Sequence, residues 1–155
     1  MAEFLADIEQ LALVRALKAS FVAYPVVNAL HIMSIGALLT SVLLMDLRIV
    51  GAFRSLPMTA FVALLRRIAF MAFGAALATG LLLFSVRAGE YAAMPVFLVK
   101  MALILLAGFN LLAFELLCRT KGGDAPASGP TACLAVVSMI LWTSVLFAGR
   151  FIGFL

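Results

Sequence analysis

The chain has 155 residues, of which 66% are hydrophobic and only 12% are charged, and its formal net charge is +4. A soluble domain carries roughly twice that share of charged residues, so the composition excludes a soluble globule and indicates a membrane protein. No basic tract with interleaved aromatic residues is present, which argues against nucleic-acid binding. The length accommodates a single membrane domain, residues 1–155, with several spans.

The first segment, residues 3–20, is amphipathic. Apolar residues recur at helical spacing, acidic residues come early, and Arg15 and Lys18 come late, which suits the helix dipole. The pattern predicts an interfacial helix that lies on the membrane, and a partner-binding helix is the alternative. The acidic start lacks the basic region that precedes the apolar core of a cleaved signal peptide.

Four longer apolar runs follow, and each reaches the roughly 20 residues that a helix needs to cross a bilayer. They occupy residues 21–45, 58–86, 96–117 and 132–152. Between the last two, the glycine- and proline-rich segment RTKGGDAPASGP predicts a loop. The expected fold class is all-α: an integral membrane four-helix bundle with an N-terminal amphipathic interfacial helix.

An even number of spans places both termini on one side of the membrane. The first and third loops carry Arg48, Arg54, Arg119 and Lys121. The positive-inside rule therefore favours these loops in the cytoplasm and both termini in the periplasm.

Charged residues within the spans fall into two layers. The layer on the cytoplasmic side contains both signs, so ion pairs can neutralise it and fix the register of the helices. A proton relay through Glu115 is the alternative reading. This layer consists of Asp46, Arg48, Arg66, Arg67 and Glu115.

The periplasmic layer consists of Asn28, His31, Thr79, Lys100 and Arg150. At 1.5 Å per helical residue, these lie roughly 6–15 Å from the outer surface. Lys100 and Arg150 have no acidic residue within the spans at their own level. Their side chains therefore either snorkel to the surface or hold a bound anion.

His31 is the only histidine of the chain. It either hydrogen-bonds a neighbouring helix or acts as an axial metal ligand. Heme b would supply both the metal for His31 and the anion for the two cations, because its iron binds a neutral imidazole and its propionates pair with Lys100 and Arg150. Asn28 and Thr79 would then orient these groups.

A second axial ligand is not obvious from the sequence. Candidates are Met33, Met71 and Met101, or the iron is five-coordinate. Because no other histidine exists, a bis-histidine site within one chain is excluded. Small residues either let the helices approach closely or make room for a flat macrocycle. They are Gly36, Gly74, Gly80 and Gly108.

Several segments carry a family resemblance: YPVVNALHIMSIGALL, MDLRIVG, TGLLLF, EYAAMPVFLVKMALILLAGFN and GRFIGFL. On these segments the chain resembles, nearly end to end, a family of small four-span bacterial inner-membrane proteins that has no assigned activity. The resemblance implies a multi-pass protein of the bacterial inner membrane.

A more distant resemblance rests on the ALH of the first span, the Thr79–Gly80 pair, Lys100 and Asn110. These are similar to the pattern of copper-resistance D-type membrane domains and of four-span protoporphyrinogen oxidases, which are membrane heme proteins. In the oxidases a first-span histidine and a third-span lysine are associated with heme and activity. The resemblance therefore implies His31 as heme ligand and Lys100 as its functional partner. The further histidines of the oxidases are absent here.

Three functions remain open at this point. The first is membrane electron transfer through heme b or a similar anionic redox cofactor in a periplasm-side polar pocket, with quinone or a partner subunit as the redox partner. The second is a cofactor-free accessory subunit of a homo-oligomer or larger complex. The third is a small copper or solute permease. Hydrolase and transferase chemistry is set aside, because no nucleophile–base pair, phosphate loop or carboxylate dyad occurs.

Overall fold

The computed structural model describes residues 2–120 and 129–154, and these are helical almost throughout. Strands are absent from both ranges, as the sequence predicts. The helices are α1 (Ala2–Gln10), α2 (Ala12–Ala19), α3 (Ala23–Val50), α4 (Met58–Val86), α5 (Ala88–Ala93), α6 (Pro95–Thr120) and α7 (Gly129–Ile152). Most of the loop expected between the last two spans, Lys121 included, lies outside the described residues.

Four helices are long and apolar enough to cross a membrane: α3, α4, α6 as far as Cys118, and α7. This confirms the all-α, multi-pass membrane class. The helix α3 continues past its expected end at Met45 and stops at Gly51, where φ is +110°. Glycine adopts this left-handed conformation at no steric cost, and the Ala52 N–H then bonds the Leu47 carbonyl at 2.9 Å, as in a Schellman cap.

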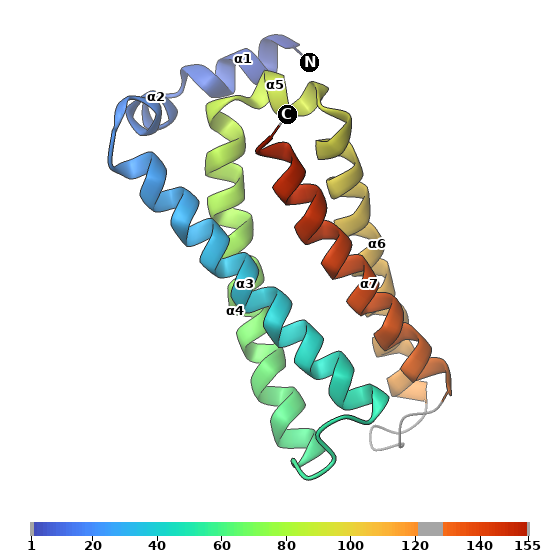
Figure 1. Ribbon diagram of the computed structural model, residues 1–155. Coiled ribbons are helices and arrows are strands. Elements are labelled where there is room, and N and C mark those ends of the chain that lie inside the picture. The colour runs from blue at the N-terminus through green and yellow to red at the C-terminus, as the bar shows by residue number, and fades with distance from the viewer. Residues whose placement is uncertain (1, 121–128, 155) are drawn as a thin grey trace.

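The spans are arranged as two helix pairs. In one pair α3 packs along α4, in the other α6 packs along α7, and α3 also contacts α7. The backbones of α4 and α6 make no contact within the described ranges. Figure 1 shows α1, α2, α5 and the last turn of α7 together at one end, which we call the terminal end, and the α3–α4 turn at the other, the connector end.

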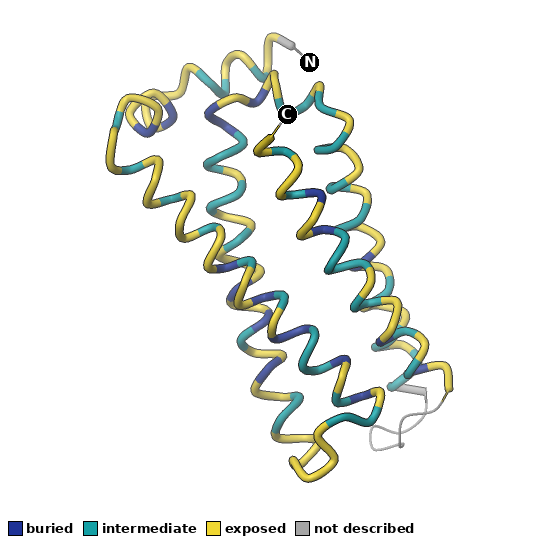
Figure 2. Tube along the Cα trace, viewed as in Figure 1, coloured by how far each residue is buried: buried dark blue, intermediate teal, exposed yellow. Residues whose placement is uncertain are grey.

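The main core lies where α3 crosses α4. Leu38 and Val42 pack there against Ala69 and Ala72, with Trp142 of α7 at the side. The small alanines allow the two helix axes to approach closely, which is how membrane helices gain packing without a hydrophobic driving force. Figure 2 shows that most other positions of the spans are exposed or partly exposed, and their apolar side chains suit contact with lipid.

The amphipathic N-terminal segment forms two helices in place of the one expected. The chain breaks at Leu11, whose ψ of 138° is not helical. Past this break, Val14 and Leu17 of α2 are buried against Val86 at the end of α4. Part of the apolar face of the segment therefore rests on the bundle itself.

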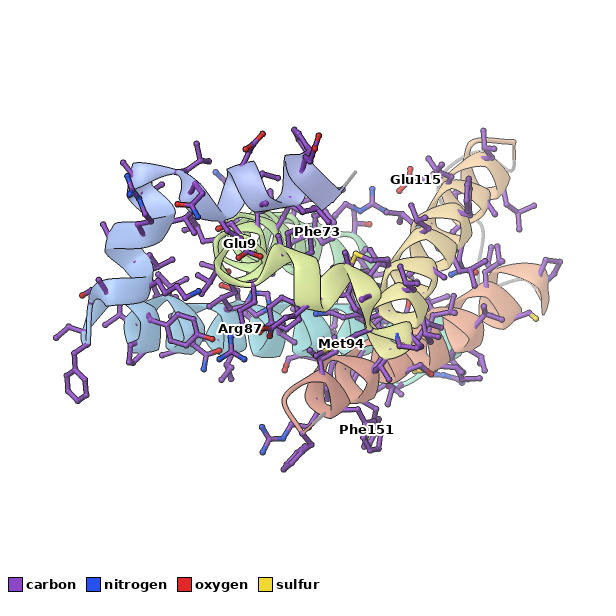
Figure 3. All side chains as sticks on the ribbon, turned by 90° about the horizontal axis from the view of Figure 1, so that it is seen from above. Glu9, Phe73, Arg87, Met94, Glu115 and Phe151 are labelled. Carbon is purple, nitrogen blue, oxygen red and sulfur yellow. The ribbon has the colours of Figure 1, made fainter. Side chains whose placement is uncertain are left out.

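The helix α1 is attached to the short helix α5. The Gly89 N–H donates to Glu9 Oε1 at 3.0 Å, so a carboxylate of α1 meets the start of α5. Figure 3, viewed from the terminal end, shows Glu9 beside α5. The stacked rings of Phe84 and Phe97, with centroids 5.3 Å apart, connect the end of α4 to the start of α6, and Tyr91 of α5 stacks on both.

Candidate functional site

His31 and Thr79 meet near the terminal end, where α3 and α4 run side by side. The distance between His31 Nδ1 and Thr79 Oγ1 is 2.9 Å. The Thr79 hydroxyl donates its single proton to the Ala75 carbonyl, 2.6 Å away. Thr79 must therefore accept from His31, so in a neutral imidazole Nδ1 carries the proton and Nε2 keeps its lone pair.

This arrangement has the form that proteins use to orient a metal-binding histidine. A ligating imidazole commonly donates its other ring N–H to a protein oxygen, which fixes both the tautomer and the ring orientation. Here Thr79 supplies that oxygen from the neighbouring helix. The same contact also serves as an ordinary interhelical hydrogen bond, so geometry alone is consistent with either role of His31.

Gly80 makes room for the imidazole. A Cβ atom at this position would lie 3.0 Å from His31 Cε1, which is tighter than nine in ten real Cβ contacts. The other small residues proposed as packing or macrocycle positions, Gly36, Gly74 and Gly108, have nothing within 4 Å of such an atom. Among these four glycines, only Gly80 is explained by a close contact, and the histidine ring itself fills the space.

Lys100 of α6 joins this group from the other helix pair. Its half-buried side chain packs over Gly149 of α7, where an added Cβ would lie 3.5 Å from Nζ. Its charge acts on the His31 ring across the space between the helix pairs, and no hydrogen bond of the described residues joins the two side chains. The ion pairs of the described residues involve other groups, so no acidic side chain there neutralises Lys100.

Arg150 and Asn28 do not join the group. The Arg150 guanidinium lies over the Phe154 ring, 4.6 Å from its centroid, and its side chain is exposed. Asn28 is also exposed, and its side chain forms no hydrogen bond with another described residue. Of the five residues predicted from the sequence, the structure joins His31 and Thr79 by a hydrogen bond, and the charge of Lys100 acts on the His31 ring; we call these three residues the polar cluster.

No second axial ligand is evident beside the polar cluster. Met33 and Met71 are 64% and 61% exposed, so both lie on outer faces of their helices, and Met101 is half-buried. Within residues 2–120 and 129–154 no three His, Cys, Asp or Glu side chains gather as they would around a metal ion. A metal held by protein side chains alone therefore finds no ligand set in this part of the chain.

An apolar groove of about 410 Å³ lies between α6 and α7 at the terminal end. Val99 and Leu103 line it on α6, and Ala148 and Phe151 line it on α7. The members of the polar cluster do not line it. The polar pocket expected on this side is therefore not seen among the described residues, and the hollow found there is apolar.

The layer at the connector end is held by bonds between helices. Arg66 of α4 pairs with Glu115 of α6 at 2.9 Å, across the helices whose backbones do not touch. Asn110 Nδ2 donates to the Leu134 carbonyl of α7 at 3.1 Å. The Arg66–Glu115 pair agrees with the structural role predicted for this layer, and Asn110, which was not part of the predicted layer, adds a second bond between helices.

Sequence reasoning missed the partners that small residues supply. Gly149 receives the stem of Lys100, and nothing in the sequence around it indicates this contact. Ser138 lies beside Asp46, and its signal was a hydroxyl within the apolar fourth span. Neither contact follows from spacing along the chain, because each joins helices far apart in the sequence.

Comparison of the chain with protein-family models, with curated proteins and with solved structures finds no significant match.

Proposed function

We propose that this protein binds heme b or a similar anionic redox cofactor through His31 and Lys100 and acts in electron transfer within a bacterial inner membrane. The observation that carries the proposal is the polar cluster: an imidazole oriented by Thr79 through Nδ1, beside a lysine without an acidic partner among the described residues. When bound, heme supplies reversible one-electron chemistry.

The donor set favours a macrocyclic cofactor over a bare metal ion. A metal ion bound by side chains needs several ligands, and the described residues offer no group of three. Heme brings four ligands of its own, so one oriented imidazole is sufficient on the protein side. The heme propionates would supply the anionic partner that the Lys100 ammonium lacks among the described residues. Arg150, which faces Phe154, is not needed in this assignment.

The four apolar helices support a multi-pass membrane protein. We further propose that the terminal end, with the polar cluster, faces the periplasm, since Arg48, Arg54 and Arg66 lie near the connector end. Quinone or a redox partner subunit would exchange electrons with the cofactor, within a homo-oligomer or a larger complex.

The proposal is tested by titrating hemin into the detergent-purified protein and following the Soret band. We expect saturable binding that His31→Ala abolishes. The matched control is Met33→Leu, because Met33 lies on the same helix, is exposed, and should leave the titration unchanged. Binding no stronger than to detergent alone, or binding that survives His31→Ala, would contradict the proposal.

Ligands with and without carboxylates distinguish an electrostatic role of Lys100 from an effect on folding. We expect Lys100→Met to weaken hemin binding roughly tenfold, the value of one hydrogen bond to a charged group. The same variant should bind heme dimethyl ester, which lacks the carboxylates, as the unchanged protein does. Equal losses for both ligands would show that Lys100 acts through folding and not through charge.

A cofactor-free accessory subunit is the second candidate. The observation that favours it is that polar groups in the spans bond one another across helices, as Arg66 does with Glu115 and Asn110 with the Leu134 carbonyl. In that case His31 and Thr79 are one more such contact. The hemin titration distinguishes the two candidates.

A further inference from the structure

The carboxyl group of Asp46, near the connector end of α3, is buried without a counter-ion. The residue is only 7% exposed. The Ser138 hydroxyl of α7 lies beside the carboxyl. The second oxygen, Oδ2, is buried and has no hydrogen-bond partner.

Among the described residues, the charged groups around Asp46 form no ion pair with it. On its own helix, Arg48 Nη2 donates to the Leu56 carbonyl, while Arg48 Nε is buried without a hydrogen-bond partner. In the following turn, Arg54 Nε donates to the Gly51 carbonyl. On α4, Arg66 pairs with Glu115 of α6, and Arg67 is exposed.

The remaining helix packed against α3 here is α7. In the neighbourhood of Ser138 it contributes the thiol of Cys133 and no charged residue. Within the described residues, Asp46 therefore forms no ion pair with any neighbouring element.

An ionised carboxylate in this position would be costly. A buried charge without a partner costs several kcal/mol, and a carboxyl group in such surroundings normally takes up a proton instead. A bound metal cation does not supply the missing counter-ion of Asp46, because the described residues contain no cluster of acidic or metal-binding side chains. A bound proton removes the charge with no further ligand.

We propose that Asp46 is an intramembrane proton-binding site: at neutral pH its carboxyl group is held as the neutral acid between α3 and α7. The contact between α3 and α7 is the one that joins the two helix pairs through their spanning backbones. Loss of the proton would place a negative charge inside that contact. The bound proton thus stabilises the packing of α3 against α7, whether or not a cofactor is bound at the polar cluster.

The test is an infrared difference spectrum of the unchanged protein minus Asp46→Asn, in detergent at neutral pH. Asparagine has the size of the neutral acid and lacks the titrating proton, so this variant should fold and melt as the unchanged protein does. We expect the difference to contain the carbonyl stretch of a protonated carboxylic acid.

Glu115→Gln is the matched control, because Glu115 is paired with Arg66. Its difference spectrum should contain the stretches of an ionised carboxylate and no acid band. Removing a carboxyl group must remove one signature or the other. Carboxylate stretches in the Asp46→Asn difference would therefore overturn the proposal.

Discussion

His31 Nδ1 lies 2.9 Å from Thr79 Oγ1, and the hydroxyl is committed as a donor to the Ala75 carbonyl. This pair of contacts determines which imidazole nitrogen carries the proton of the neutral ring. It joins α3 to α4 and leaves Nε2 with a lone pair. The assignment of His31 as an oriented ligand depends on this relationship.

Replacing Thr79 by valine should destabilise the protein by about 1 kcal/mol, the usual value of an interhelical hydrogen bond in a membrane protein. Valine has the shape of threonine but leaves the His31 N–H without its acceptor. Thermal unfolding in detergent measures the loss. Thr79→Ser, which keeps the hydroxyl, is the control. A valine variant as stable as the serine variant would show that the contact contributes nothing.

Gly80→Ala should destabilise the protein by about 1–3 kcal/mol, the range for overpacked sites. The new methyl group would lie 3.0 Å from His31 Cε1, so the ring would have to shift by a few tenths of an ångström and strain its hydrogen bond to Thr79. Gly74→Ala is the control on the same helix, since nothing lies within 4 Å of its added Cβ. It should be neutral or stabilising, because alanine favours a helix over glycine by up to about 1 kcal/mol. Equal effects at both glycines would contradict the close contact.

The ion pair between Arg66 and Glu115 should show a coupling energy of only about 0.2–1 kcal/mol, because both side chains are partly exposed and screened. A double-mutant cycle with Arg66→Gln, Glu115→Gln and both together measures it by thermal unfolding. We expect the double variant to be less destabilised than the sum of the single variants. Strict additivity would mean that the pair does not connect α4 to α6.

Tyr91, in α5 outside the spans, should ionise late. Burial raises the pKa of its phenol above the ordinary value, and the neighbouring Tyr24 side chain adds to the effect. A phenol whose pKa is raised on folding stabilises the fold fully below the unfolded-state pKa of about 10. That contribution is lost as the pH rises through the folded-state pKa.

The measurement is an ultraviolet titration of tyrosinate in Tyr24→Phe, where Tyr91 is the remaining tyrosine. Its midpoint should lie above that of the same variant unfolded in denaturant. Coinciding midpoints would show that Tyr91 is not buried against the ends of α4 and α6.

The fold class was predictable because it depends on composition and run length. Apolar runs long enough to cross a bilayer determine the spans, and Gly51 and Pro57 mark the turn between the first two. The break at Leu11 was not predictable, since the amphipathic pattern continues through it. It arises because α2 turns to bury Val14 and Leu17 on α4, a tertiary contact.

The candidate site was predictable in part. Depth along each helix placed His31, Thr79 and Lys100 at one level, where the structure joins His31 to Thr79 and the charge of Lys100 acts on the His31 ring. The same reasoning included Arg150, but depth does not determine the direction in which a side chain points. The Phe154 ring, one turn further along the chain, attracts the guanidinium away from the cluster. The sequence predicted that ion pairs neutralise the layer that contains Asp46, whereas Asp46 itself is buried and forms no ion pair among the described residues.

The most direct test of the central claim is an absorption spectrum of the protein purified from heme-replete cells, oxidised and after dithionite, beside His31→Ala. The account predicts a Soret band and a reduced-state α band in the unchanged protein, both absent from the variant. A colourless protein that folds normally would contradict the assignment of His31 and Lys100 to a heme-type cofactor.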